Sequence, residues 1–185
     1  WHPTKNGDLT PADVTGGTHK KVWWKCPVAD DHEWSTSVGL RCYKKSGCPC
    51  CAGLAPSVTN RLDTQFPDVA AQWHPTKNGD LTPADVVGSS PRKHWWKCEV
   101  ADDHRWCAPV SRMSSPLASG CPFCAGKQAS STNNLRDHGR SVLLAEWDYL
   151  ENKPLRPEHV PMSSGKRVAW ACPVAPDHRW RAQIA

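Results

Sequence analysis

The chain has 185 residues and a formal net charge of +5, with 10 Cys and 11 Trp but only 2 Tyr and 2 Phe. Hydrophobic residues make up 38% of it, which is lean for one large apolar core, so a further source of stability is expected. No apolar run approaches the roughly 20 residues that span a bilayer, which excludes a membrane helix. No signal-peptide pattern is present. The mild positive charge permits a nucleic-acid partner without requiring one.

An internal repeat organises the sequence. Residues 1–14 recur identically as residues 73–86, and a weaker third copy runs over residues 147–160. All 11 Trp fall into four repeat columns, numbered 1/73/147, 23/95, 24/96/170 and 34/106/180. Small-residue stretches near residues 54 and 127 mark the boundaries. We therefore predict three domains of about 72–74 residues per full repeat: residues 1–54, without an N-terminal helix; residues 55–127; and residues 128–185, cut short.

A turn and a hairpin are predicted first in chain order. Residues 2–10 are rich in Pro, Asn, Gly and Asp and predict a turn. Residues 22–25 and 33–38 predict two short strands. Because the chain begins at Trp1 rather than Met, we expect it to be a piece of a longer protein.

A helix is predicted at the start of the second repeat. Either Thr59 or Asn60 can N-cap it, and its apolar face continues to Gln72. Pro67 lies inside this stretch and either splits the helix or marks its true first turn. The equivalent helix in the third repeat is expected over residues 134–146.

Cysteine and histidine recur with a fixed spacing. Cys26 and His32 are separated by five residues, and Cys48 and Cys51 follow after 15 more; the second repeat has the same pattern with a gap of 16. Zinc favours four tetrahedral ligands, usually thiolate and imidazole, and a closed set of four is typical of a structural site. We predict two complete zinc sites and one half site, whose second ligand pair is expected beyond residue 185. The predicted ligands are Cys26, His32, Cys48 and Cys51; Cys98, His104, Cys121 and Cys124; and Cys172 with His178.

The alternative for so many cysteines is a disulfide framework. The histidines that repeat with the cysteines, and the missing secretion signal, favour zinc. Cys50 aligns with Phe123, so we assign it as a spacer, while Cys42 and Cys107 have no cysteine counterparts. Free thiolate chemistry also predicts a cytoplasmic location.

Aromatic and basic residues accompany the predicted strands. Alternate strand residues share a face, so Trp24 is expected beside the zinc site, whereas Trp23 and Lys25 face the other way. A Trp beside a Lys suits base stacking and phosphate contact; the alternative is that Trp23 packs on the upstream turn or a neighbouring repeat. Arg41 and Arg112 lie between the second strand and the second ligand pair and could reach a phosphate; the alternative is that they belong to a solvated charged loop. The other Trp columns are expected in the core. The predicted nucleic-acid contacts are Trp23, Lys25, Arg41, Trp95, Lys97 and Arg112.

The sequence shows no catalytic constellation. His2 and Asp8 recur in the second copy, but the third copy has Asp148 and Pro154 at those positions, which favours turn packing. We find no nucleophile with a base, no phosphate loop and no set of catalytic carboxylates. The chain is therefore predicted not to be an enzyme.

The motifs together resemble a known family. Trp-x4-Asn-Gly-x-Leu-x-Pro, Trp-Trp-Lys-Cys, His-x-Trp and Gly-Cys-Pro-x-Cys are similar to the tandem "probable zinc-ribbon" or treble-clef zinc finger family of unknown function, which is common in bacteria. The resemblance implies a small metal-stabilised α+β fold, a β-hairpin zinc site plus a helix in each repeat, and Zn²⁺ at the ligands above. Some members lie beside very-short-patch-repair-like endonuclease domains, which implies a DNA-related context. Zinc ribbon and treble clef both remain open.

The combined prediction is a zinc-binding tandem repeat module that binds nucleic acid, with DNA as the favoured form. It would thereby direct the larger protein that contains it, for example one with a fused nuclease domain, to nucleic acid. The alternative is a protein-interaction or spacer array in which zinc is purely structural. Exposure of Trp23 separates the two, because burial against a neighbouring repeat leaves no ring for stacking.

Overall fold

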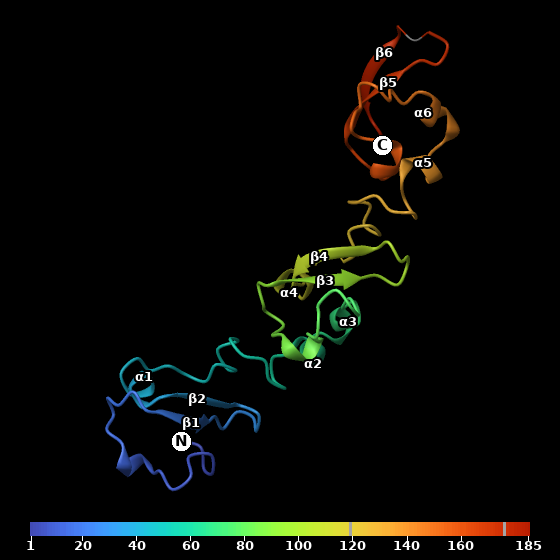
Figure 1. Ribbon diagram of the computed structural model, residues 1–185. Coiled ribbons are helices and arrows are strands. Elements are labelled where there is room, and N and C mark those ends of the chain that lie inside the picture. The colour runs from blue at the N-terminus through green and yellow to red at the C-terminus, as the bar shows by residue number, and fades with distance from the viewer. Residues whose placement is uncertain (119, 176) are drawn as a thin grey trace. The chain divides into compact units, whose positions relative to one another are not determined.

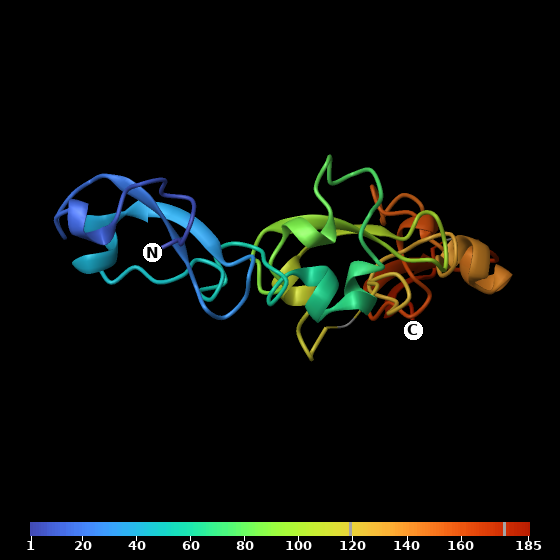
Figure 2. The same ribbon diagram turned by 90° about the horizontal axis from the view of Figure 1, so that it is seen from below.

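The computed structural model describes residues 1–118, 120–175 and 177–185. Contacts divide the chain into two compact units, Trp1–His94 with Pro109–Ser115 and Trp95–Ala108 with Pro116–Ala185. Both units are built from short strands and short helices joined by long loops (Figures 1 and 2). This is the small α+β class expected from the sequence. Among the described residues, no helix is long and apolar enough to cross a membrane.

The described residues form three two-stranded sheets. The two strands predicted first are present, although the first begins one residue earlier and the second ends at Ser37. In the antiparallel first sheet Trp24 lies opposite Trp34, and in the third Trp170 lies opposite Trp180. The sheets pair β1 (Lys21–Lys25) with β2 (Glu33–Ser37), β3 (Lys93–Lys97) with β4 (Arg105–Pro109), and β5 (Arg167–Ala171) with β6 (Arg179–Gln183).

A short helix follows the second strand of the first two hairpins. These are α1 (Val38–Cys42) and α4 (Val110–Met113), and Figure 1 shows α1 at the end of β2. The sequence analysis missed both and placed Val38 in the strand. Ser37 ends the strand because its hydroxyl accepts a hydrogen bond from the Leu40 N–H (3.4 Å), which caps α1.

A single unbroken helix from Thr59 or Asn60 through Gln72 is wrong, whereas the split predicted at Pro67 is confirmed. Two short helices are present instead, α2 (Leu62–Gln65) and α3 (Pro67–Ala70), separated by Phe66. Pro67 opens α3, where its missing N–H leaves no helical hydrogen bond unmade.

The cap prediction fails as well, because the N-cap residue of α2 is Arg61. In the third repeat, the predicted start at Asn134 is confirmed, since its side chain accepts from the Asp137 N–H at 2.8 Å. This stretch also divides in two, with a break at Gly139. Its helices are α5 (Leu135–His138) and α6 (Ser141–Ala145).

The turn before each hairpin ends in a single turn of 3-10 helix with Pro at its first position. In the first of these, the Asp13 carboxylate accepts from the Thr10 hydroxyl at 2.6 Å and from the Thr10 N–H at 2.8 Å, and these contacts lower the pKa of Asp13. The three segments are η1 (Pro11–Asp13), η2 (Pro83–Asp85) and η3 (Pro157–His159).

His2 and Asp148 stabilise their turns in the same way. The Nδ1 atom of His2 accepts from the N–H groups of Thr4 (3.2 Å) and Lys5 (3.1 Å). The Oδ1 atom of Asp148 accepts from two successive N–H groups at 3.0 Å each. Because both side chains accept from the backbone N–H groups of the turn, turn packing explains why a histidine in the first repeat is replaced by an aspartate in the third.

Tryptophans form much of the core. In the third repeat Trp147 packs edge-on against Trp170 with 5.7 Å between ring centroids, and in the first Trp1 meets Trp24 at 5.8 Å. The expectation that the 34/106/180 column is core is wrong for Trp180, which is 41% exposed. The third-repeat core consists of Leu135, Trp147, Val160, Val168, Trp170 and Ile184.

Candidate metal centre

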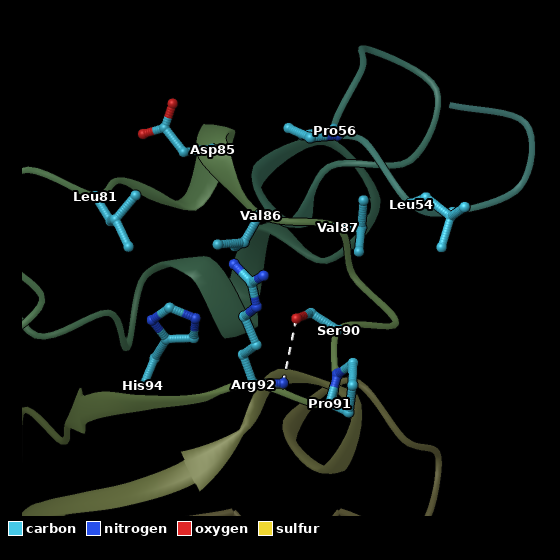
Figure 3. Close-up of a pocket in the computed structure, with 11 residues that line it drawn as sticks. Leu54, Pro56, Leu81, Asp85, Val86, Val87, Ser90, Pro91, Arg92 and His94 are labelled. Carbon is cyan, nitrogen blue, oxygen red and sulfur yellow. Dashed lines mark hydrogen bonds between the residues drawn. The ribbon is translucent and has the colours of Figure 1, made fainter. Parts of the chain in front are cut away.

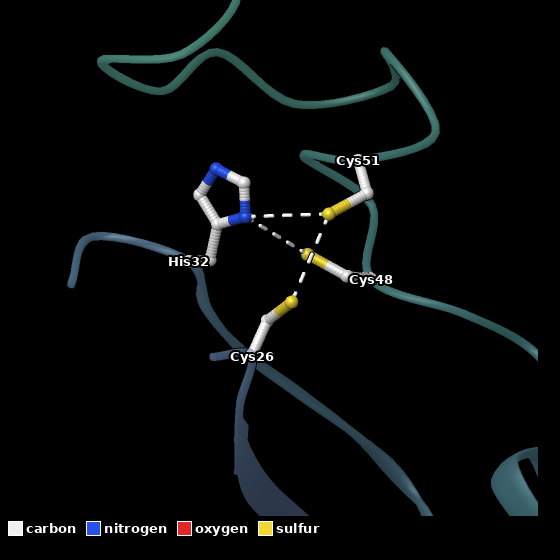
Figure 4. A group of neighbouring side chains, drawn as sticks. All are labelled: Cys26, His32, Cys48 and Cys51. Atoms are coloured by element: carbon white, nitrogen blue, oxygen red, sulfur yellow. Dashed lines mark hydrogen bonds between the residues drawn. The ribbon is translucent and has the colours of Figure 1, made fainter. Parts of the chain in front are cut away.

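Four side chains of the first hairpin region converge on one point. The ligand atoms of Cys26, His32, Cys48 and Cys51 all lie within 4.8 Å of one another (Figure 4). His32 Nδ1 is 3.6 Å from the sulfur of Cys48 and 3.4 Å from that of Cys51, and the sulfurs of Cys26 and Cys51 are 3.7 Å apart. A tetrahedral Zn²⁺ with Zn–S bonds of about 2.3 Å needs sulfurs about 3.8 Å apart, so both the donor set and the spacing fit zinc.

The second cluster repeats this geometry. Cys98, His104, Cys121 and Cys124 also lie within 4.8 Å of one another. His104 Nδ1 is 3.6 Å and 3.5 Å from the sulfurs of Cys121 and Cys124, and the Cys98 and Cys124 sulfurs are 3.7 Å apart. Both clusters fit four-coordinate structural sites.

Local backbone hydrogen bonds position the ligands. Cys26 directly follows β1 and His32 directly precedes β2, and the Cys26 N–H donates to the His32 carbonyl at 2.9 Å. The pair Cys48 and Cys51 lies on a tight turn that ends at Gly53, where the Gly53 N–H donates to the Cys50 carbonyl at 3.0 Å. Gly53 has a φ of +67°, a backbone conformation that favours glycine.

The histidine of each cluster is fully buried, and its second nitrogen is also engaged. His32 Nε2 lies 2.9 Å from the hydroxyls of both Ser57 and Thr59. Such outer hydrogen bonds fix the ring and raise the basicity of the ligand nitrogen. His104 has the same contacts, at 2.9 Å, with Ser130 and Thr132.

The sequence contained a signal for these outer residues. Ser-x-Thr-Asn occurs at residues 57–60 and again at 130–133, although in the first of these Thr59 and Asn60 also fit the helix cap predicted above. The Asn60 amide instead donates to the carbonyls of Cys50 (2.7 Å) and Ala55 (3.0 Å), which ties this segment to the second ligand pair.

Without a cation, the thiols of Cys51 and Cys124 resist ionisation. Desolvation of the sulfur, followed by its contacts with Cys26 and Cys48, raises the pKa of Cys51 to about 11. Desolvation and the neighbouring thiols raise that of Cys124 to about 12. A divalent cation reverses this balance, because it stabilises the thiolate form.

Cys50 and its counterpart Phe123 are both buried beside the clusters. The Phe123 ring stacks on His104 with 5.0 Å between centroids. Cys50 does not belong to the converging group of four, as its assignment as a spacer requires. Burial, and then the neighbouring Cys48, raises the pKa of the Cys50 thiol.

The third hairpin holds the beginning of such a site. The Cys172 N–H donates to the His178 carbonyl at 3.0 Å, as in the first hairpin. Among the described residues, this pair is not part of a group of three or more candidate ligands, and His178 is exposed. The half site therefore remains a prediction.

The predicted nucleic-acid contacts lie in different environments. Trp23 and Trp95 are 39% and 37% exposed. Lys25 pairs with Asp30 at 3.2 Å, and Lys97 with Asp102 at 3.1 Å.

The two arginines among these predicted contacts differ from each other. The Arg41 guanidinium lies over the rings of Trp24 (5.0 Å) and Trp34 (5.4 Å) and donates to the Ser46 carbonyl. Arg112 is exposed on α4. Arg41 thus has partners inside the fold, whereas the side chain of Arg112 is open to solvent.

Comparison with known families finds a match in three segments of the chain. A family model described as a probable treble clef zinc finger domain matches residues 1–54, 69–127 and 143–185. The first two segments each contain one complete Cys/His cluster, and the third contains Cys172 and His178. This description favours the treble clef over the zinc ribbon. No match was found among curated proteins.

Proposed function

The chain belongs to the family of probable treble clef zinc finger domains, and we propose that it is a zinc-binding module that binds nucleic acid, with DNA as the favoured form. Through this binding it would direct the larger protein that contains it to the nucleic acid. The two Cys/His groups that fit Zn²⁺ support the zinc-binding part. A closed set of four protein ligands leaves no open position for a substrate, so the metal serves the fold.

The observation that carries the nucleic-acid proposal is the environment of Trp23. Its ring is 39% exposed on β1, and the Lys5 ammonium lies 4.8 Å from the ring centroid. The Lys5 ammonium also pairs with the Glu33 carboxylate. The aromatic face offers stacking to a base, and the adjoining phosphate can exchange with Glu33 as the ionic partner of Lys5.

The lysines on the same strands are available for exchange. Lys25 and Lys97 pair with Asp30 and Asp102, which lie in the turns between the strands. The hydrogen bond from Lys97 lowers the pKa of Asp102, so this carboxylate is charged at neutral pH. Exposed pairs of this kind contribute about 0–1 kcal/mol, so a phosphate can replace the aspartate at little cost.

Of the two arginines predicted to contact nucleic acid, only one supports the proposal. Arg112 is exposed and fits a phosphate contact. Arg41 makes its contacts with Trp24, Trp34 and Ser46 inside the first repeat, so we assign it to the fold.

One observation favours the alternative, a protein-interaction array. Each turn between Cys and His presents the same apolar residue to solvent: Val28 (63% exposed), Val100 (65%) and Val174 (90%). A repeated, exposed apolar side chain at the tip of a rigid hairpin is a suitable anchor for a protein partner.

A fluorescence titration of the zinc-loaded chain separates these functions. Duplex and single-stranded oligonucleotides are added at low and moderate salt, and both Trp emission and the anisotropy of labelled oligonucleotide are followed. The proposal predicts quenching and an affinity that falls steeply with salt, because phosphate contacts release counterions. Trp23→Ala is expected to weaken single-strand binding by about 1–3 kcal/mol.

The matched control is Tyr43→Ala, which removes an aromatic ring that is 75% exposed elsewhere in the first repeat. Lys25→Ala should lower the salt slope by about one phosphate contact. Absence of binding at low salt, in protein that retains its zinc, would exclude the nucleic-acid function and favour the valine tips as the functional surface.

A further inference from the structure

A pocket lies beside β3 and next to the turn that carries Cys51, since Gly53 and Leu54 are among the residues that line it. Its volume is about 330 Å³, and none of the residues that line it belongs to either group. Figure 3 shows Arg92 and His94 side by side, with Leu81, Val86 and Leu54 among the apolar residues around them. This volume is at the lower end of the range for small-molecule sites.

His94 is an unusual residue for this position. It is only 8% exposed, and its Nε2 atom has no hydrogen-bond partner among the described residues. One face of the ring packs on Trp73, with 4.7 Å between centroids. Leaving a buried polar atom unpaired is unfavourable, so such an atom in a pocket calls for a ligand.

The repeat provides an internal comparison for this position. The residues equivalent to His94 are Val22 and Val168, which are 3% and 2% exposed. A valine therefore satisfies the packing of this site in the other two copies. The fold does not need a histidine here, which leaves binding as the reason for it.

Arg92 supplies the charge. It lies two residues before His94 on the same strand, and alternate strand residues share a face. It is exposed and makes none of the ion pairs among the described residues. Its backbone N–H donates to the Ser90 hydroxyl oxygen at 3.3 Å, which leaves the Ser90 proton free to donate.

The other titratable group of the pocket does not neutralise Arg92. The Asp85 carboxylate accepts from the N–H and hydroxyl of Thr82, at 2.8 and 2.6 Å. In Figure 3 it points away from the Arg92 guanidinium. Burial, and then the charge of Arg92, lowers the pKa of His94, so the imidazole is neutral at neutral pH. Its Nε2 atom can then form a hydrogen bond without carrying a charge.

We propose that this pocket binds one nucleotide, with its phosphate on Arg92, the edge of its base on His94 and a face of the base against Leu81 and Val86. The choice of a nucleotide over another small anion rests on the proposed function, whereas the existence of a ligand site rests on the pocket itself. A free nucleoside monophosphate and a nucleotide within a strand present the same chemistry.

The test is a titration of the zinc-loaded chain with adenosine 5′-monophosphate, inorganic phosphate and adenosine. Binding is followed by Trp emission and by the NMR shift of the His94 Nε2 atom. The monophosphate should bind at least about tenfold more tightly than phosphate or adenosine, because only it fills both halves of the pocket. Equal affinity of the three, or no shift at His94, would overturn the proposal.

Two variants and one control locate the site. His94→Val and Arg92→Gln should each weaken monophosphate binding at least about tenfold. His94→Val should keep the fold and zinc content, because valine occupies the equivalent positions 22 and 168. Lys20→Gln, at the position equivalent to Arg92 in the first repeat, should leave the affinity unchanged. An unchanged affinity in His94→Val would exclude the pocket.

An oligonucleotide arm distinguishes the two sources of the ligand and the two proposals. Displacement of a bound single strand by the monophosphate would assign the pocket to the strand, and simultaneous binding would assign it to a free nucleotide. If the oligonucleotide binds but the monophosphate does not, the pocket proposal fails while the nucleic-acid function stands. If only the monophosphate binds, the pocket stands and the nucleic-acid function fails.

Discussion

The first and third hairpins share their local geometry but differ in the metal site. In both, the Cys N–H donates to the His carbonyl, at 2.9 and 3.0 Å. In both, the indole N–H of a strand Trp donates to a backbone carbonyl of the opposite strand, from Trp24 to Thr36 (3.1 Å) and from Trp170 to Ala182 (3.3 Å). Yet His32 is fully buried, whereas His178 is exposed.

This difference shows what each part of the fold requires. Hairpin shape follows from hydrogen bonds between residues close in sequence, so it forms with or without a second ligand pair. Burial of the histidine follows from the segment with Cys48, Cys51, Ser57 and Thr59, which covers it. Within the described residues, the third repeat buries an apolar core around Trp147 and Trp170.

The largest expected effect is the loss of a complete cluster. Cys48→Ser should reduce the zinc content from two ions per chain to one, because three remaining ligands do not close a structural site. Structural zinc binding has an apparent free energy of about 10–16 kcal/mol, so the region around His32 should lose its order. Elemental analysis of purified protein and amide exchange measure the two effects.

Cys172→Ser is the control for this loss, since it removes the cysteine of the half site, which is the counterpart of Cys26. Its zinc content should equal that of the wild type. A wild type with three zinc ions, or a loss of zinc in Cys172→Ser, would show that the third hairpin is also a metal site and would remove the contrast.

A smaller effect is expected from the outer hydrogen bonds of His32. The double change Ser57→Ala with Thr59→Ala should weaken zinc binding at the first site by about 10- to 100-fold, because the ring loses the groups that orient it. Competition with a coloured chelator measures the affinity. The second site, with Ser130 and Thr132 intact, is the control within the same molecule.

The smallest effect concerns the asparagine of the turn. Asn152 exchanges two buried hydrogen bonds with the backbone of Ala169, at 2.7 and 2.8 Å, and Asn6 makes the equivalent pair with Trp23 in a more exposed setting. Asn152→Ala should cost about 1–3 kcal/mol, and Asn6→Ala less. Thermal unfolding of the two variants gives the comparison, and equal costs would mean that burial is not what distinguishes the repeats.

The sequence predicted those features that depend on repetition and spacing. The hairpin strands and the convergence of Cys26, His32, Cys48 and Cys51 follow from a pattern present twice in one chain. Zinc coordination narrows the choice of partners to a few residue types, which makes spacing informative. The nucleic-acid contacts of Trp23 and its neighbours stay predictions.

The sequence was less informative where one residue type serves several purposes. Thr59 and Asn60 suit a helix cap, and only the folded chain shows that they bond to His32 and to the ligand turn instead. Val38 has a strong strand preference that the Ser37 cap overrides. The unpaired nitrogen of His94 depends on the packing of distant segments, so no local pattern indicates it.

The asparagine of the turn has a further consequence for solubility. In β1 the N–H and carbonyl of Trp23 point away from β2, and the Asn6 amide pairs with both, at 2.8 and 3.0 Å. Unpaired strand edges recruit strands from other molecules and promote aggregation. The Asn6 side chain thus takes the place of a neighbouring strand at Trp23, as Asn152 does at Ala169 of β5, so at these two positions the strand edge has no unpaired backbone groups to offer another strand.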